Sequence, residues 1–182
     1  PGRRCIIDDE WGVNNKKAAT LNQGGAYNIC LFIFIIDWWN LMNVDKLVGN
    51  TPMIKIDYEY EGKKGSIYSK VEYYNYSGSI KDRIALYIIQ KEKERGNLKE
   101  GQPIIEVTSG NTGIAFSAIG ALLGHEVHIF MPDWVSLERR KLIEMYGATV
   151  HLVSKEEGGF KRALELAEEF AIENDAYRPL QF

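Results

Sequence analysis

Residues 104–124, IIEVTSGNTGIAFSAIGALLG, join a short apolar run, a polar turn and a second apolar stretch. The pattern predicts a buried strand over Ile104–Val107 and a helix over Thr112–Leu123 that ends at Gly124. Backbone N–H groups at a helix start, with hydroxyl and amide side chains beside them, favour a carboxylate or phosphate. A simple helix cap is the competing interpretation of this turn. The turn consists of Thr108, Ser109, Gly110 and Asn111.

A second polar turn precedes a second helical pattern, in the segment NYSGSIKDR at residues 75–83. Lys81 follows the turn residues Ser77, Gly78 and Ser79, and isoleucines recur every fourth residue around it, at 80, 84 and 88. The positive end of a helix dipole disfavours a protonated ammonium. This position therefore favours a nucleophilic amine, although a lysine at a helix start is more often simply exposed.

Strand and helix patterns continue to alternate after residue 124. Apolar runs predict strands over Val127–Met131 and Thr149–Val153, and helical periodicity predicts helices over Ser136–Tyr146 and Gly159–Asn174. This alternation is typical of α/β domains, so we expect a parallel sheet flanked by helices on both faces. The expected apolar sides are Leu137, Leu142 and Ile143 in the first helix and Phe160, Ala163, Leu164, Ala167 and Phe170 in the second.

Composition indicates one soluble domain with a core, since 45% of the 182 residues are hydrophobic and 26% are charged. A net charge of -3 argues against nucleic-acid binding. Cys5 and Cys30 lack metal-ligand spacing, which favours a reducing cytoplasm, although one disulfide between them stays open. The histidines are expected to be structural, and no metal is expected.

Residues 1–43 form a leader that we assign to no domain. Its apolar run Ile29–Ile36 (ICLFIFII) has eight residues, whereas about 20 are needed to cross a bilayer, so we expect no membrane partner. The run is best interpreted as a buried strand. It could cover an apolar face of the folded region or dock another chain.

Residues 44–182 resemble the N-terminal domain of the fold type II pyridoxal-phosphate enzymes, and most of all the cysteine synthase (O-acetylserine sulfhydrylase) family. The resemblance implies that the chain is truncated to about the first domain, because the loop that binds the cofactor phosphate in that family has no counterpart here. Four segments carry the resemblance: VGNTPMIKI at 48–56, NYSGSIKDRIAL at 75–86, EVTSGNTGIAFSAIGALLG at 106–124 and FMPDWVSLERRKLIEMYGA at 130–148.

The resemblance implies a role for each residue of the two turns. Lys81 would bind pyridoxal 5′-phosphate covalently and act as the general base, and Asn111 would hydrogen-bond the cofactor's 3-hydroxyl. Tyr76 and Ser77 depart from the Pro-Gly or Pro-Thr pair that is usual there, but Gly78 and Ser79 are kept. The substrate carboxylate would be held by Thr108, Ser109, Gly110, Thr112 and Gln181.

The implied reaction is a β-replacement that converts O-acetylserine and sulfide to L-cysteine in the cytoplasm. The implied partners are these small molecules and either a second copy in a homodimer or a complementary second-domain chain. Two alternatives stay open. One is a catalytically inactive binding module, and the other is a related β-elimination or β-replacement enzyme, such as cystathionine β-synthase, a serine/threonine dehydratase or a cysteine desulfhydrase.

Overall fold

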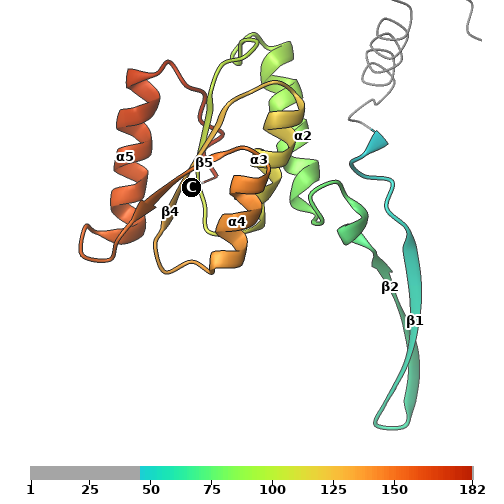
Figure 1. Cartoon of the computed structure of the whole chain (residues 1–182). Coiled ribbons are helices and arrows are strands. Elements are labelled where there is room, and N and C mark those ends of the chain that lie inside the picture. The colour runs from blue at the N-terminus through green and yellow to red at the C-terminus, as the bar shows by residue number, and fades with distance from the viewer. Residues whose placement is uncertain (1–45, 182) are drawn as a thin grey trace, which may run out of the picture. The chain divides into compact units, whose positions relative to one another are not determined.

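The computed structural model describes residues 46–181, in which three parallel strands form the larger of two sheets. The prediction for Ile29–Ile36 lies outside these residues. Strand β4 (Val127–Pro132) lies between β3 (Ile104–Val107) and β5 (Thr149–Val153), as Figure 1 shows. Both β3 and β4 are buried along their whole length, as expected for parallel strands covered on two faces. The predicted strands are confirmed, and β4 extends one residue further than expected.

Helices cover both faces of this sheet, as the sequence predicted. Helices α3 (Asn111–Leu122) and α4 (Leu137–Met145) pack on one face, and α5 (Gly159–Glu173) packs on the other (Figure 1). Side chains alternate between the two faces along each strand, so two separate cores form. Ile104, Ile129 and Met131 join the α3 and α4 side, whereas Ile105, Val107 and Phe130 join the α5 side.

Helix α2 (Lys81–Glu94) packs beside α3, but of the three isoleucines that identified it in the sequence only Ile88 packs against the core. Ile80 is 53% exposed and Ile84 is 45% exposed, and the buried apolar side chains are those of Ala85, Leu86 and Ile89. Spacing at i, i+1 and i+4 around Ala85 defines the true inner face. In α4 the expectation for Leu137 is likewise wrong, because its side chain is 61% exposed, whereas the expected burial of Ile143 is confirmed.

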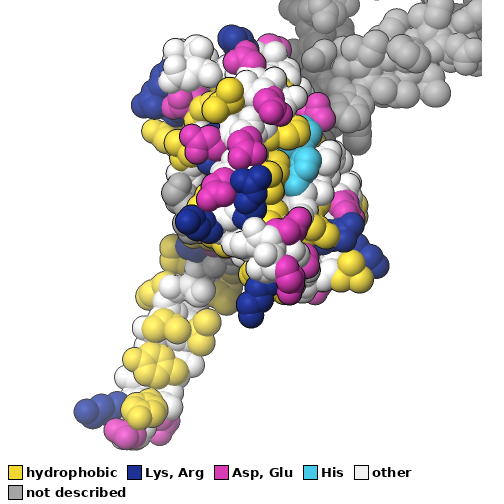
Figure 2. Space-filling model, turned by 90° about the vertical axis from the view of Figure 1, so that its left-hand side faces the viewer, with side chains coloured by type: hydrophobic (Ala, Val, Ile, Leu, Met, Phe, Trp, Pro, Cys, Tyr) yellow, Lys and Arg dark blue, Asp and Glu magenta, His cyan; other side chains and the backbone are white. Residues whose placement is uncertain are grey.

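The segment before α2 forms a β-hairpin, β1 (Met53–Tyr60) and β2 (Lys63–Lys70), which pair antiparallel with each other. Glu61 and Gly62 connect the strands, and both have positive φ, as a two-residue hairpin turn requires. A one-turn 3₁₀ helix, Glu72–Tyr74, follows. Strand alternation places one set of apolar side chains on a common face, and all of them are exposed (Figure 2): Ile54, Ile56, Tyr58, Tyr60 and Ile67.

Candidate functional site

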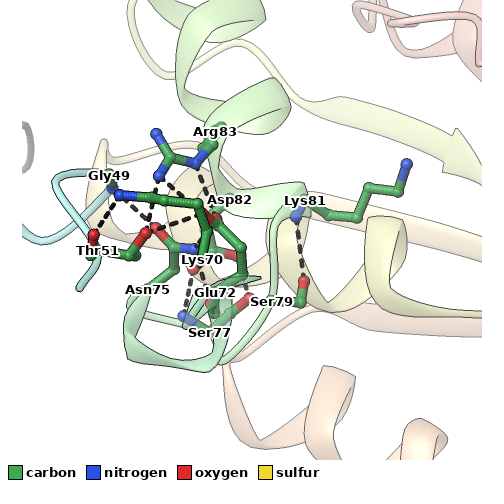
Figure 3. Close-up of polar contacts among 10 residues, drawn as sticks. All are labelled: Gly49, Thr51, Lys70, Glu72, Asn75, Ser77, Ser79, Lys81, Asp82 and Arg83. Carbon is green, nitrogen blue, oxygen red and sulfur yellow. Dashed lines mark hydrogen bonds and ion pairs between the residues drawn. The ribbon is translucent and has the colours of Figure 1, made fainter. Parts of the chain in front are cut away.

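Lys81 is the first residue of α2, as the sequence predicted for a lysine at a helix start. Its backbone N–H donates to the Ser79 hydroxyl at 3.2 Å. Its side chain points away from the neighbouring polar cluster (Figure 3), and its amine has no hydrogen bond or ion pair with any residue in 46–181. The backbone of Lys81 is therefore held at the start of α2, and its amine has no anionic partner among those residues.

The turn before Lys81 is closed by the next residue, Asp82, whose side chain is completely buried. One Asp82 carboxylate oxygen accepts the Ser77 N–H at 2.5 Å, and the other accepts the Ser77 hydroxyl. Burial raises the pKa of Asp82, and the two bonds from Ser77 oppose that rise. Gly78 lies inside this loop with φ +89°, a conformation that favours glycine.

On its other side the turn is anchored by a charged network centred on Glu72 (Figure 3). Arg83 donates from Nε and Nη2 to the two Glu72 oxygens at 2.8 and 2.9 Å. Thr51 Oγ1 and Asn75 Nδ2 also donate to this carboxylate, each at 2.8 Å. The Arg83 guanidinium is the main reason that the pKa of Glu72 is lowered to about 2. Asn75 in turn accepts the Gly49 N–H at 2.8 Å. Residues 49–51 are therefore connected to residues 75–80, the turn before α2 that we call the Lys81 turn.

The second predicted turn connects β3 to α3, which begins at Asn111, one residue earlier than expected. Thr108 and Thr112 are buried, whereas Ser109 and Asn111 are exposed. Gly110 occupies the N-cap position, and no side chain in the described region caps this helix. The Gly113 N–H donates to Gly110 O at 3.0 Å, whereas the Asn111 and Thr112 N–H groups are not consumed by a cap, which leaves them available to an anion.

Contacts of α4 place the two turns on the same side of the molecule. The rings of Tyr76, in the Lys81 turn, and Tyr146, at the C-cap of α4, lie 6.0 Å apart. One turn earlier in α4, Ile143 Cδ1 would lie 3.3 Å from a Cβ built on Gly113, in the first turn of α3. The end of α4 thus contacts the neighbourhood of Lys81 and the start of α3.

Gln181 is brought next to the β3–α3 turn by the segment that follows α5. Tyr177 continues the sheet beside β3, since its N–H donates to Pro103 O at 2.8 Å and its carbonyl accepts the Ile105 N–H at 2.9 Å. Further along, the buried Glu106 carboxylate accepts the Val107 N–H at 2.9 Å, and the backbone of Gln181 lies near the same carboxylate. Burial raises the pKa of Glu106, and the backbone N–H groups of Val107 and Gln181 oppose the rise. Gln181 therefore lies beside the strand that leads into Thr108.

The sequence did not identify four residues that build this region: Glu72, Asp82, Arg83 and Glu106. The signal for Asp82 and Arg83 was their position directly after Lys81 at a helix start, where adjacent charges of both signs are easily taken for a solvated face. Glu106 interrupts an otherwise apolar strand, which is itself a signal, because buried carboxylates are rare unless they are hydrogen-bonded. Nothing in the sequence around Glu72 indicates its role, since its partners come from distant segments.

The three histidines lie in or next to the sheet. His125 Nδ1 is 2.9 Å from Gln102 O, and His128 Nδ1 is 3.1 Å from His151 Nε2. His151 also stacks on Phe130, with ring centroids 4.3 Å apart. Within residues 46–181, no three His, Cys, Asp or Glu side chains are grouped to hold a metal ion.

The matches to known proteins cover most of this chain but less than half of its relatives. The family model described as pyridoxal-phosphate dependent enzyme matches residues 44–182. Cysteine synthase from Staphylococcus aureus is 39% identical over 140 residues, 77% of this chain and 45% of that protein. Cysteine synthase B from Escherichia coli is 41% identical over 131 residues, 72% of this chain and 43% of that protein.

Solved structures agree with the sequence relatives. A hydrogen sulfide-producing enzyme from Fusobacterium nucleatum is 50% identical with a TM-score of 0.73, covering 81% of this chain and 44% of that one. An O-ureido-L-serine synthase is 37% identical with a TM-score of 0.68, over 76% of this chain and 43% of that one. No helix within residues 46–181 is long and apolar enough to span a bilayer.

The family model and the structural matches show that the chain belongs to the pyridoxal-phosphate dependent enzymes and has the fold of their type II members.

Proposed function

We propose that this chain provides the lysine and the carboxylate-binding loop of a cysteine synthase-like enzyme. Such an enzyme replaces the acetate group of O-acetylserine by sulfide and forms L-cysteine. The observation that carries the proposal is the environment of Lys81. It is the first residue of α2 and follows a turn that is anchored on two sides, and its amine has no partner among the described residues. An amine without an anionic partner is suited to react with a carbonyl group.

The residues around Lys81 fit pyridoxal phosphate at its aldehyde end. Lys81 would hold the aldehyde carbon, and Asn111, whose carboxamide is exposed and has no bond to the described residues, would hold the 3-hydroxyl. The loop is open at Gly110, where an added Cβ would meet no heavy atom within 4 Å. When bound, the cofactor supplies the electron sink that stabilises negative charge on the substrate's Cα.

The protein's share of the reaction is orientation and proton transfer. The substrate carboxylate would lie against the N–H groups that begin α3, with the Ser109 and Thr112 hydroxyls beside it and the Gln181 carboxamide reaching it from the neighbouring segment. Thr108 and Gly110 complete this loop. Fixing the carboxylate directs the Cα–H bond at Lys81 Nζ, which takes the proton as a general base.

A second candidate is the release of hydrogen sulfide from cysteine. The observation in its favour is identity, which is 50% to the Fusobacterium nucleatum hydrogen sulfide-producing enzyme and 41% to cysteine synthase B from Escherichia coli. Both reactions would use the same lysine and carboxylate loop and would differ in what leaves from, or adds to, Cβ. The two turns described above therefore do not distinguish the two reactions, which differ in the chemistry at Cβ.

Lysine trapping tests the proposal before any assay of turnover. The chain is incubated with pyridoxal phosphate, reduced with borohydride and digested, and modification is measured at each lysine by mass spectrometry. We expect modification concentrated at Lys81 and abolished by Lys81→Ala, with the exposed Lys161→Ala as the control. Modification spread evenly over exposed lysines contradicts the proposal.

Turnover distinguishes the two candidate reactions. The chain spans 43–45% of the length of the cysteine synthases, so turnover is measured both without and with a chain that supplies the remaining length. Cysteine formation from O-acetylserine and sulfide is compared with sulfide release from cysteine, with the chain alone and with the C-terminal half of cysteine synthase B added. Activity of the mixture that Lys81→Ala removes supports the enzyme, and its main product identifies the reaction. A chain that traps the cofactor but never turns over with any second half favours a binding module.

A further inference from the structure

The residue after Lys81 carries a carboxylate that never meets the Lys81 amine. Asp82 is completely buried, and both of its oxygens are used by Ser77, through the N–H at 2.5 Å and through the hydroxyl. In Figure 3 the Lys81 side chain extends away from Asp82. A buried carboxylate is tolerated only when hydrogen bonds replace the water that it loses, so this arrangement holds Asp82 firmly on Ser77.

Arg83, the residue after Asp82, binds a different segment from the one that Asp82 binds. Arg83 forms its two-point contact with Glu72, which also holds Thr51 and Asn75. Asp82 and Arg83, which are consecutive in one helical turn, thus bind two different segments. Asp82 binds the turn before Lys81 at Ser77, which we call the Ser77 loop, and Arg83 binds the network around Glu72. Lys81 lies between the loop and these anchors, and its own side chain takes part in neither.

We propose that Asp82 is a positioning residue for Lys81, which acts by closing the Ser77 loop around the start of α2 and by keeping its own charge away from the lysine amine. The proposal rests on the proposed function of Lys81 as the lysine that binds the cofactor. It assigns to Asp82 no contact with substrate or cofactor.

Two effects follow from this geometry. With the loop closed, the first turn of α2 cannot fray, and Lys81 stays on the side of the molecule that carries Asn111 and the β3–α3 turn. Because its carboxylate is buried on Ser77 and the Lys81 side chain extends away from it, Asp82 does not form an ion pair with Lys81, which would lower the reactivity of the amine. Burial raises the pKa of Asp82, and the Ser77 bonds oppose this, so the closed loop favours the ionised carboxylate.

The first test compares two aldehydes of different size on the full chain. Trapping by pyridoxal phosphate requires Lys81 and its surroundings together, whereas reductive methylation by formaldehyde requires only access to the amine. For Asp82→Asn we expect the pyridoxal phosphate rate at Lys81 to fall about tenfold, because a hydrogen bond to a charged group is lost. We expect the formaldehyde rate at Lys81, and both rates at exposed Lys161, to stay within about twofold. Exposed Asp133→Asn is the matched control, and unchanged trapping by a folded Asp82→Asn overturns the proposal.

A second measurement keeps the test informative where trapping or folding fails. Hydrogen exchange of the amides of residues 77–82 reports loop closure without any cofactor, and we expect their protection to be lost in Asp82→Asn and reduced in Ser77→Ala. If Asp82→Asn does not fold, Ser77→Ala is used for both measurements, and wild-type trapping with wild-type protection then overturns the proposal. If the wild-type chain shows no preference for Lys81, the proposed function fails. Exchange alone then decides whether Asp82 closes this loop.

Discussion

Arg83 and Glu72 form a two-point ion pair, with Nε and Oε2 2.8 Å apart and Nη2 and Oε1 2.9 Å apart. The two residues come from different segments, the 3₁₀ helix after the hairpin and the first turn of α2. Thr51 and Asn75 fill the remaining positions on the carboxylate. This pair therefore connects three segments that are separate in the sequence, and Lys81 lies two residues before Arg83.

The ion pair predicts acid-sensitive stability. The pKa of Glu72 is about 2 in the folded chain against 4.5 as the ordinary value, so the unfolded chain takes up the proton first as pH falls. The contribution of Glu72 to stability is fully present above about pH 4.5 and is lost as pH falls toward about pH 2. We expect Glu72→Gln to lower the melting temperature at neutral pH and to flatten its dependence on pH in that window. The exposed Glu156→Gln is the control, and equal pH profiles for Glu72→Gln and wild type would contradict this role.

The paired histidines predict a second pH effect, at higher pH. Burial and the neighbouring His128 lower the pKa of His151 below its ordinary 6.5, so the unfolded chain binds a proton at a pH where the folded chain does not. The contribution of His151 to stability is then fully present above about pH 6.5 and is lost as the pH drops through the folded-state pKa.

We expect His151→Phe to keep the ring stacked on Phe130 and to reduce the loss of melting temperature between about pH 7.5 and about pH 5.5. Thermal melts by circular dichroism at both pH values measure it. A variant that loses as much stability on acidification as wild type would show that the histidine pair is not responsible.

Glycine is required where α3 approaches β3 and α4. A Cβ on Gly113 would lie 2.7 Å from Thr108 Cγ2 and 3.3 Å from Ile143 Cδ1, so a side chain forces its neighbours apart. Overpacking costs about 1–3 kcal/mol, and better helix propensity returns at most about 1 kcal/mol. We expect Gly113→Ala to lower the free energy of unfolding by about 1 kcal/mol in urea titrations. Gly110→Ala, which adds its Cβ to open space, is the matched control, and equal losses would show that crowding is not the cause.

Among residues 46–181, Phe116 is the largest side chain that is fully buried, in the core that α3 shares with α2 and the sheet. Phe116→Ala removes a ring from a closely packed site and leaves a cavity, so we expect a loss of about 3–5 kcal/mol in unfolding free energy. Ile172→Ala, on the exposed side of α5, should change it by less than about 0.5 kcal/mol. A loss at Phe116 no greater than that at Ile172 would place the core elsewhere.

The strand and helix pattern after residue 104 was predictable because it is local. Ile104–Val107 and Thr149–Val153 are strands at the predicted bounds, and the helix starting near Gly159 buries the alanines expected to face inward. Hydrophobic periodicity reports such elements directly, since each buries one face against the sheet. Resemblance in the two turns predicted the family, which the comparisons confirm.

Sequence alone therefore determined the α/β class, the order of the later strands and helices, and the candidate residues Lys81, Asn111 and Thr108–Thr112. Tertiary structure decided which face of α2 is buried, because Ile80 and Ile84 have the right spacing but α3 packs against Ala85 and Ile89. It also decided that Asp82 is buried on Ser77 and that Arg83 pairs with Glu72. The physical reason is that these contacts join segments that lie apart in the sequence, and the free energy of burying a charge depends on partners that no local pattern reveals.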